Sequence, residues 1–332
     1  MIDMVKVSIL VPVYGVERYI ENCAVTLFEQ TYENIEYVFV NDSTKDRSME
    51  ILHEVMERYP LRRDNVHIIT HEVNRGLGAA RKTALLNATG DFVMHVDSDD
   101  SLSLDAVEML VDKAIQTGAD IVDCGYEKTN NGKVVSTHIP FHGTHDNYLR
   151  IMLCQNIVSN RIWGRLYRRS LFSDYEINPI DGVDYGEDFA IVPRLMYYAK
   201  RVWVDSPGYK YRTENYSSYT HSFTKKSFVS MWRASAIVYG FFQTRDVEKK
   251  YDFALQMGML NMIRAMRKND YKMDILNSFC NYRANGLIPG FIAKLFMGSC
   301  PYPIANIIYL ITRRLYAMFI LKSVHLPTCG KG

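Results

Sequence analysis

The sequence lacks the cysteine and leader patterns that mark several classes of protein. Its 332 residues include six cysteines, which form no C-x-x-C pair and have no histidine at zinc-ligand spacing. Neither a disulfide framework nor a structural zinc site is therefore predicted, and each cysteine is interpreted as a reduced thiol. The apolar residues 5–13 lack the basic start and the small-residue cleavage site of a signal peptide. We therefore expect a cytoplasmic location.

Net charge is small, at +2, but its distribution along the chain is uneven. Residues 1–199 carry 19 Lys and Arg against 30 Asp and Glu, whereas residues 200–332 carry 20 against 7. The basic part indicates an anionic partner, such as a nucleic acid or a lipid surface, unless the two parts neutralise each other. With 48% hydrophobic and 23% charged residues, the chain is otherwise typical of a globular protein of one large or two smaller domains.

Short β-branched segments alternate with amphipathic segments over the first 125 residues. The predicted strands are residues 7–13, 37–40, 66–70, 92–96 and 121–124, and the predicted helices are residues 16–30, 52–59, 79–88 and 104–117. This alternation predicts βαβ units and a mainly parallel sheet. Because ligands bind at the carboxyl ends of the strands in such sheets, we expect the polar residues that follow them, at Tyr14, Asp42 and Asp97, to meet at one edge.

The second half of the chain has a mixed pattern and then a helical one. Strands are predicted at residues 133–139, 201–204 and 208–212, and mostly helices from residue 223 to the end. A helix within residues 303–322 would place six apolar residues on one side: Ile304, Ile307, Ile308, Ile311, Leu315 and Phe319. Arg313 and Arg314 oppose a bilayer-spanning helix, since one central charge costs about 2.5–3.5 kcal/mol. We interpret this helix as interfacial, at an anionic membrane surface; the alternative is a helix packed on the rest of the protein.

The strongest chemical feature is a cluster of carboxylates directly after the predicted strand 92–96. Asp97, Ser98, Asp99 and Asp100 are consecutive. Carboxylates at a strand end can share a hard divalent cation whose remaining ligands are diphosphate oxygens and water. Asp and Ser also begin helices, and Ser101 or Ser103 would begin the next one here. Three acidic residues exceed what a helix start needs, and their mutual repulsion favours a bound cation.

Two further segments offer contacts to a nucleotide. Asp42 follows the predicted strand 37–40 and can accept a hydrogen bond from a base or ribose, or it can stabilise a turn, as we expect for Asp46. Residues 74–81 form a loop with Gly76 and Gly78 that enters a helix carrying Arg81. Free amides at a helix N-terminus attract phosphate, and Arg81 adds positive charge. A paired-glycine turn without phosphate explains the same residues equally well.

Glu187 and Asp188 follow Gly186 at the start of an apolar run. A carboxylate at this place can act as general base toward a sugar hydroxyl. The alternative is an acidic pair that the dipole of a helix favours at its N-terminus.

Several aromatic residues can line a carbohydrate or phosphate pocket, although such residues are more often part of a core. They are Trp163, Tyr209 and Tyr211, with Arg212 beside them in sequence. His95 lies inside a predicted strand and is interpreted as a hydrogen-bonded core histidine without a role in chemistry.

Together these motifs resemble the inverting glycosyltransferases of family 2, which have the GT-A fold. Residues 12–14 resemble the family's P-x-Y element, and residues 40–46 its V-N/D-D-G-S-T-D element. Residues 74–81 are similar to N-x-G-x-x-x-A-R, and residues 96–100 contain D-x-D-D. Residues 161–167 and 186–188 resemble the W-x-K-L-Y and G-E-D elements. The order and spacing agree over about residues 5–215, with departures at four positions, Gly15, Ser43, Lys82 and Arg165, where Asn, Gly, Asn and Lys are usual.

The resemblance implies a set of donor-binding residues. Asp42 would contact the base of the donor nucleotide, with Pro12 and Tyr14 forming the wall beside it. Asp97 would hold the ribose or the sugar of the donor. Arg81 would help to orient the donor.

The resemblance also implies a metal ligand and an acceptor side. Asp99 would bind Mn²⁺ or Mg²⁺ on the diphosphate, and Asp188 would be the catalytic base. Gly76, Ser98, Trp163 and Glu187 belong to the matching motifs and are predicted to bind substrate.

The expected fold is α/β, with a GT-A-like Rossmann-type mainly parallel sheet flanked by helices and a helical C-terminal extension. Residues 1–222 would form the catalytic domain, with a donor half at about 1–125 and an acceptor half at about 126–222. Residues 223–332 would form a basic, membrane-associating extension.

The expected reaction moves a sugar from a nucleotide-sugar donor, a UDP-sugar, to a hydroxyl of a lipid-linked saccharide acceptor, with inversion. It would serve cell-surface polysaccharide synthesis, with the protein peripheral at the inner face of the cell membrane. No nucleic-acid partner is expected. Two other functions fit some of the residues. A sugar-1-phosphate nucleotidyltransferase would need a glycine-rich phosphate loop that residues 7–14 lack, and a non-catalytic nucleotide-sugar or membrane-surface binding protein would not need both Asp99 and Asp188.

Overall fold

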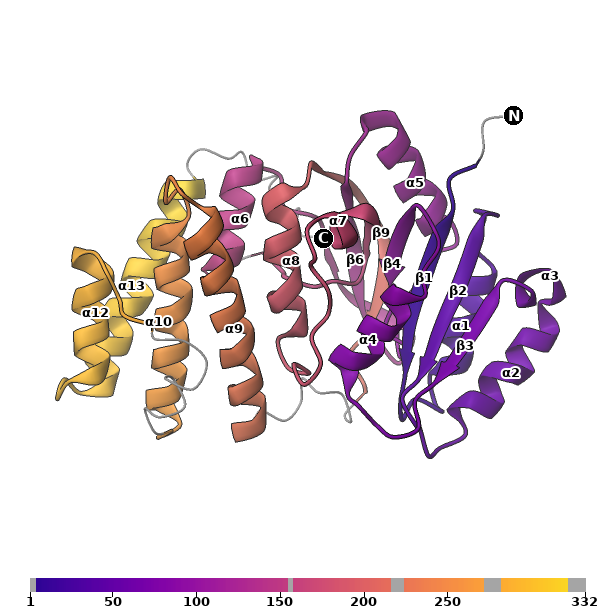
Figure 1. Cartoon of the computed structure of the whole chain (residues 1–332), viewed down its shortest axis with the longest axis horizontal. Helices are drawn as coiled ribbons and strands as arrows, with labels where there is room; N and C mark the ends of the chain where they lie inside the picture. Colours follow the sequence, from indigo (N-terminus) through magenta and orange to yellow (C-terminus); the bar gives the residue numbers. More distant parts are fainter. Residues whose placement is uncertain (1–3, 155–157, 216–223, 272–281, 322–332) are drawn as a thin grey trace. The chain divides into compact units, whose positions relative to one another are not determined.

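The computed structural model describes residues 4–154, 158–215, 224–271 and 282–321. The chain forms two compact units. The first comprises residues 1–140, 161–187 and 198–222, and the second comprises residues 141–160, 188–197 and 223–332. Figure 1 shows a sheet with helices in the first unit and helices in the second. The expected domains, 1–222 and 223–332, stay a prediction.

The first unit is built on one sheet, which has nine strands in the described residues, in the order β3-β2-β1-β4-β8-β6-β9-β5 with β7 beside β6. They are β1 (Val7–Val13), β2 (Ile35–Asn41), β3 (Val66–Thr70), β4 (Phe92–His95), β5 (Ser101–Leu102), β6 (Ile121–Asn130), β7 (Lys133–His138), β8 (Arg165–Arg168) and β9 (Arg201–Arg212). β1 is parallel to β2 and β4, and β2 to β3 (Figure 1). β8 runs antiparallel to both β4 and β6, so the sheet is mixed beyond β4.

The first unit has helices on both faces of its sheet. They are α1 (Ile20–Phe28), α2 (Ser48–Arg58), α3 (Pro60–Arg63), α4 (Leu77–Leu86) and α5 (Ala106–Thr117), followed later in the unit by α7 (Ser170–Asp174). Alternate residues of β1 and β2 form one core with α1, α2 and α5. The opposite face carries α4, whose buried Ala79, Ala80 and Ala84 let its backbone approach the sheet. Burial of each large apolar side chain stabilises the fold by about 1.5–3 kcal/mol. The packed core therefore holds the strands in place, and with them the residues at the strand ends.

Some elements differ from those predicted. Ser101 and Leu102 form β5 against β9 rather than the start of a helix, and α5 begins at Ala106 after Asp105. The separate strands predicted at 201–204 and 208–212 are one strand, β9, whose register with β6 shifts around Gly125. The shift accounts for the break in the hydrophobic pattern. β8 was not predicted, because four residues with three basic or aromatic side chains have no clear strand alternation.

The second unit is helical in its described residues. Its elements are α6 (His145–Leu153), most of α8 (Glu187–Tyr198), α9 (Lys225–Arg245), α10 (Asp252–Lys268), α12 (Leu287–Met297) and α13 (Tyr302–Leu321). The predicted helical pattern after residue 223 is confirmed for 224–271 and 282–321, whereas 272–281 and 322–332 lie outside the described residues. α6 was not predicted.

α13 is apolar on two sides. Ala305, Tyr309, Ala317 and Ile320 are buried, which agrees with packing inside the unit. Five of the six residues expected on one apolar side are at least half exposed: Ile304, Ile307, Ile311, Leu315 and Phe319. The helix therefore packs through one side and leaves an apolar side exposed, and its interpretation as an interfacial helix stays a prediction. Among the described residues, no helix combines the length and the apolar character that a bilayer span requires.

The cysteines that the structure describes are reduced thiols, as predicted. Burial raises the pKa of Cys23, Cys124 and Cys154, so these thiols resist ionisation and act as small core residues. Cys280 and Cys329 lie outside the described residues.

Candidate active site

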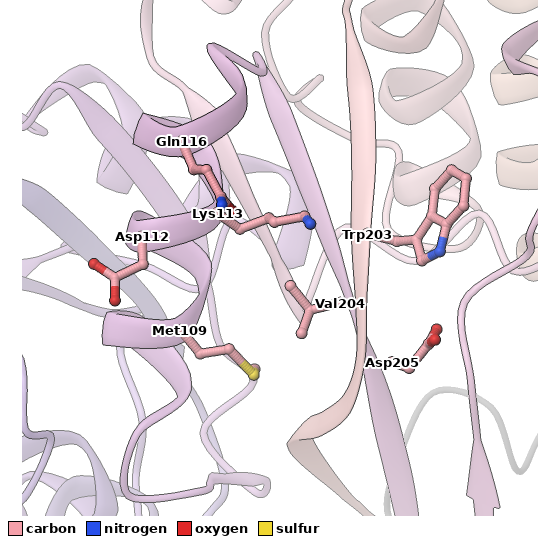
Figure 2. A pocket seen from close by; sticks show the side chains of 7 residues that line it. All are labelled: Met109, Asp112, Lys113, Gln116, Trp203, Val204 and Asp205. Carbon is pink, nitrogen blue, oxygen red and sulfur yellow. The ribbon is translucent and has the colours of Figure 1, made fainter.

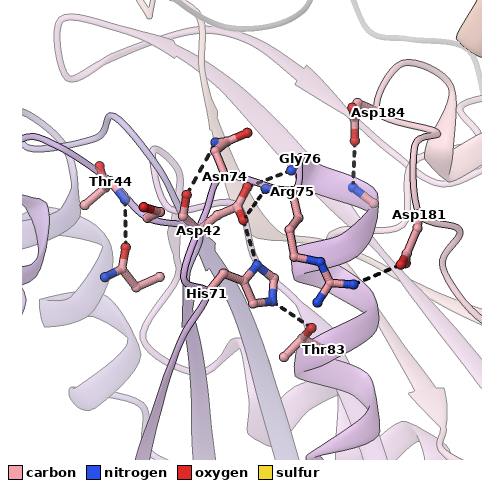
Figure 3. Close-up of polar contacts among 12 residues, drawn as sticks. Asp42, Thr44, His71, Asn74, Arg75, Gly76, Thr83, Asp181 and Asp184 are labelled. Carbon is pink, nitrogen blue, oxygen red and sulfur yellow. Dashed lines mark hydrogen bonds and ion pairs between the residues drawn. The ribbon is translucent and has the colours of Figure 1, made fainter.

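The carboxyl ends of β1 to β4 lie at one edge of the sheet, because the four strands are parallel. The residues that follow them belong to this edge, as the sequence predicts. Tyr14 after β1 is 51% exposed, whereas Asp42 after β2 and His71 after β3 are buried. Asp97 follows β4 by one residue and is half-buried. Figure 3 shows the part of the edge around Asp42.

Residues 97–100, here called the acid turn, are fixed from β9. The Tyr209 hydroxyl donates to Asp100 Oδ2 at 2.8 Å and accepts from the Asp97 amide at 3.1 Å. The Arg212 amide donates to Asp100 Oδ1 at 2.8 Å. Asp100 is only 1% exposed, so its carboxylate supports the turn from inside. The pocket-lining role considered for Tyr209 is wrong, since Tyr209 is fully buried, whereas the one considered for Arg212 stays a prediction.

The acid turn concentrates negative charge that is partly removed from water. Burial, and then the charge of Asp97, raise the pKa of Asp99. Burial, and then Asp99 and Asp97, raise the pKa of Asp100 well above its usual value. Asp99 Oδ2 accepts one hydrogen bond, from the Asn215 amide group at 2.7 Å. A cation would relieve this repulsion between carboxylates.

The donor set at the acid turn fits a hard cation that also binds substrate. Within the described residues, no three His, Cys, Asp or Glu side chains gather as a metal site. Mg²⁺ and similar ions are often held by one or two carboxylates together with substrate phosphates, rather than by a cage made only of protein ligands. Asp99 suits that mode, because its carboxylate is an oxygen donor with one described hydrogen-bond partner.

Arg81 lies at the centre of the charged contacts of the site. Its Nη2 is 2.8 Å from Asp97 Oδ1 and 3.6 Å from Glu187 Oε1. The side chain is 1% exposed, so the guanidinium is enclosed by groups that neutralise it. Arg81 thus brings together two other residues predicted to bind substrate, Asp97 and Glu187.

Residues 74–78, here called the donor-side loop, are bound to carboxylates on both sides (Figure 3). The Arg75 and Gly76 amides donate to Asp42 at 2.9 and 2.8 Å. The Gly78 amide donates to Asp184 at 3.2 Å, and Arg75 forms an ion pair with Asp181 at 2.9 Å. The amides predicted to face a phosphate therefore have carboxylate acceptors here, which favours the paired-glycine alternative for this loop.

The two glycines of the donor-side loop allow close packing of residues 180–184. A Cβ at Gly76 would lie 2.6 Å from Asp184 Oδ2, and a Cβ at Gly78 would lie 2.5 Å from the Ile180 carbonyl oxygen. Gly76 also has φ 89° and ψ 168°, a conformation that is essentially restricted to glycine. Ser43 adopts φ 58°, a left-handed conformation that favours glycine. Glycine is usual at this position in the family that the sequence resembles, so the turn after β2 keeps its left-handed shape although serine has a side chain.

Trp163 belongs to an aromatic cluster next to the acid turn. Its ring stacks on Tyr209 at 4.4 Å and on Tyr211 at 5.4 Å between centroids. The guanidinium of Arg161 lies 5.1 Å from the centroid of Trp163. Because Tyr209 also bonds to the acid turn, Trp163 is connected to the same group of residues.

Several predicted site residues of the first unit contact one another, in two groups. Contacts run from Asp42 to Gly76 and from Arg81 to Asp97 and Glu187, while Ser98 is buried inside the acid turn. Pro12 is buried in β1 beside Val40 of β2.

Asp188 is the next residue after Glu187 in α8 and belongs to the second unit. Its role as a base and the substrate contacts of the other residues stay predictions. Asp46 accepts from the amide and hydroxyl of Ser48, which confirms the turn interpretation of this residue.

Several residues of the site were not predicted. His71 contacts Asp42 at 2.7 Å, and Asn215 forms a hydrogen bond with Asp99. Neither residue belongs to a motif, so the sequence alone does not indicate these contacts. Asp181 and Asp184 were seen only as part of a polar loop. His95 is buried, as predicted, but neither ring nitrogen has a hydrogen-bond partner among the described residues, and burial lowers its pKa well below the usual value.

A cavity of about 480 Å³ lies away from these residues, between α5 and β9. Its lining includes Met109, Asp112, Lys113 and Gln116 from α5 and Val204 from β9. Figure 2 shows Val204 pointing toward α5, whereas Trp203 points to the other side of the strand. The cavity is lined by none of the predicted site residues.

In open α/β sheets ligands bind outside the carboxyl ends of the strands, which is where the acid turn and Arg81 lie. Residues 8–176 match the model of glycosyl transferase family 2, and the chain belongs to this family. The putative glycosyltransferase EpsH of Bacillus subtilis is 33% identical over 232 residues, which cover 68% of this chain and 65% of that protein. The poly(ribitol-phosphate) beta-glucosyltransferase of Bacillus spizizenii is 30% identical over 204 residues, covering 60% of this chain and 31% of that protein. The chain thus spans less than two thirds of the length of these relatives.

The fold is also similar to that of a solved structure, S. aureus TarS 1-349 in complex with UDP-GlcNAc. The TM-score is 0.66 at 19% sequence identity, and the match covers 96% of this chain and 91% of that one. The predicted GT-A-like fold and the resemblance to family 2 are therefore confirmed. The family match also decides against the nucleotidyltransferase alternative.

Proposed function

We propose that the chain transfers a sugar from a nucleotide-sugar donor to an acceptor hydroxyl, with inversion, in the synthesis of a cell-surface polysaccharide. The observation that carries this proposal is the contact of Arg81 with both Asp97 and Glu187 at the carboxyl edge of the sheet. It joins the motif expected to bind the donor with the motif that ends in the expected base. The complex of TarS with UDP-GlcNAc supports a UDP-sugar as the donor.

On the donor side, the acid turn would bind the diphosphate and its cation. Asp99 would ligate Mn²⁺ or Mg²⁺, and the bound cation would neutralise charge on the departing diphosphate. Asp97 would bind the ribose or sugar while its other partner, Arg81, keeps the carboxylate in place. The positive charge of Arg81 also favours an anionic donor nearby.

On the acceptor side, Asp188 would remove the proton from the acceptor hydroxyl. The hydroxyl oxygen then attacks the anomeric carbon from the face opposite the nucleoside diphosphate, and the bond to that diphosphate breaks. This single displacement inverts the anomeric configuration. Asp188 lies in the first turn of α8, where the helix dipole stabilises the carboxylate form that a base requires.

Replacement of Asp188 by Asn tests the assignment of the base. We expect D188N to lose transfer while its Kd for the donor stays within about threefold of wild type, because the amide keeps the shape but cannot take a proton. Donor binding can be measured by calorimetry, and transfer by release of the nucleoside diphosphate. Asp174, exposed at the end of α7, provides the matched control D174N, which should behave as wild type. Turnover retained in D188N would overturn the assignment.

We also propose that the acceptor is lipid-linked and that α12 and α13 contact an anionic membrane at the cytoplasmic face. Large apolar side chains are exposed on both helices, with Leu287 at 94% and Phe319 at 78%. Residues 282–321 contain four basic residues and no acidic residue, a composition that suits anionic lipid. Apolar side chains beside positive charge favour the interface of such a bilayer.

Sedimentation with vesicles tests the membrane proposal. The wild-type protein should bind phosphatidylglycerol-containing vesicles and release them at high salt. The double variant L287S/F319S should bind about tenfold or more weakly, since each side chain loses its burial in lipid. Leu61 is 91% exposed in the first unit and gives the control L61S. Equal binding by L287S/F319S and L61S would contradict the proposal.

A further inference from the structure

Thr83, His71 and Asp42 form a continuous chain of hydrogen bonds that ends at the backbone amides of the donor-side loop (Figure 3). Thr83 Oγ1, on α4, lies 2.9 Å from His71 Nε2, and His71 Nδ1 lies 2.7 Å from Asp42 Oδ1. Asp42 in turn accepts from the Arg75 and Gly76 amides. The chain therefore links α4, the residue after β3, the end of β2 and the donor-side loop.

The direction of these hydrogen bonds follows from the groups involved. An ionised carboxylate only accepts, so Nδ1 of His71 must carry a proton. In the neutral imidazole, Nε2 is then an acceptor, and the Thr83 hydroxyl donates to it. The side chains of His71 and Asp42 are 5% and 4% exposed, so water has little access to replace either bond.

The hydrogen-bonded chain controls two features of the candidate site. Both Asp42 oxygens are used to orient the donor-side loop, with the Gly76 amide on one and the Arg75 amide on the other. Thr83 lies two residues after Arg81 on the same helix, so its bond to His71 restrains the rotation of α4 about its axis. That rotation determines where the Arg81 guanidinium meets Asp97.

We propose that His71 is a positioning residue, which holds the donor-side loop and Arg81 in the arrangement that binds the donor. It acts through Asp42 and Thr83 and does not itself touch the substrate. The link to donor binding rests on the proposed function, whereas the ordering of the loop does not.

Hydrogen exchange of the full-length protein without ligand tests the ordering directly. We expect H71A to exchange the Arg75 and Gly76 amides about tenfold or more faster than wild type, because the carboxylate that accepts from them loses its buried partner. H71N can keep a donor near the Nδ1 position but cannot reach Thr83, so its increase should be smaller. T83V, which removes only the hydroxyl, should fall between wild type and H71A. H67A, at an exposed histidine of β3, is the matched control and should exchange as wild type.

Binding of UDP in the presence of Mn²⁺ tests the second half of the proposal. In calorimetry, H71A should bind UDP about tenfold or more weakly at unchanged stoichiometry, and H71N should recover part of the loss. A purely structural role would instead lower the stoichiometry and leave Kd unchanged, which would overturn the positioning role. Unchanged exchange at residues 74–81 in H71A, or in H71N and T83V if H71A does not fold, would also overturn it. Wild-type protein that binds none of UDP, GDP and dTDP would overturn the proposed function, and with it the link to the donor.

Discussion

Replacement of Gly76 by Ala would test how closely residues 180–184 pack on the donor-side loop. Gly76 has φ 89° and ψ 168°, where a side chain costs about 1–3 kcal/mol of backbone strain. The added Cβ would also lie 2.6 Å from Asp184 Oδ2, and displacement of that carboxylate is an overpacking cost of about 1–3 kcal/mol. We expect G76A to lower the free energy of unfolding by about 2–6 kcal/mol, measured by urea denaturation.

Gly118 supplies a control for the strain alone. It ends α5 with φ 61° and ψ 30°, and a Cβ there would meet nothing within 4 Å. G118A should therefore cost only about 1–2 kcal/mol. Combining G76A with D184A removes the obstructing carboxylate and should recover part of the loss. A G76A variant that is no less stable than G118A would refute the close packing inferred here.

Three further predictions concern buried charge and hydrogen bonding. Burial alone would raise the pKa of Glu36, but hydrogen bonds from Lys6, Ser8 and Thr89 lower it to about 2. Glu36 therefore contributes about 3 kcal/mol to the free energy of unfolding at pH values above the pKa of the unfolded state, and this contribution should disappear as the pH falls from about 4.5 toward 2. In E36Q the free energy of unfolding should depend less on pH over this range. Y209F removes the hydroxyl shared by Asp100 and the Asp97 amide and should destabilise the protein by about 1.5–3 kcal/mol in urea denaturation, unlike Y175F at a partly exposed ring. D123N should cost about 3–5 kcal/mol in the same assay, since it leaves the positive charge of Arg161, Arg165 and Arg201 without its buried carboxylate.

Each of these predictions has an outcome that would contradict it. Parallel pH profiles for wild type and E36Q would mean that Glu36 is not the source of the acid sensitivity. Equal stability of Y209F and Y175F would remove the support assigned to the acid turn. A D123N variant as stable as wild type would show that the three guanidinium groups do not depend on this carboxylate.

The sequence was informative where one physical rule governs many residues in a row. β1 to β4 were predicted because short β-branched runs alternate with amphipathic helices, and the parallel order then predicts which residues share an edge. The carboxylate cluster of the acid turn is visible in the sequence because its members are consecutive, and the cation site inferred from their repulsion stays a prediction. Both features are local, so a single sequence contains them.

The contacts that hold the site together could not be predicted, because they join distant segments. Tyr209 meets the acid turn across 109 residues of chain, and its register depends on the shift between β6 and β9. Asp184 meets Gly78 across 106 residues, which gives the glycines of the donor-side loop a second reason to be small. The proposed role of His71 depends on its hydrogen bonds with Asp42 and Thr83, and no spacing in the sequence predicts these bonds.

Metal-dependent consumption of a nucleotide sugar tests the central claim most directly. Wild-type protein and D99N would be incubated with UDP-, GDP- and dTDP-sugars, with Mn²⁺, with Mg²⁺ or with chelator, and release of the nucleoside diphosphate would be measured. The account predicts that wild-type protein consumes at least one of these donors only when the metal is present, and that D99N is at least about a hundredfold slower. Consumption of no donor, or equal rates for wild type and D99N, would contradict it.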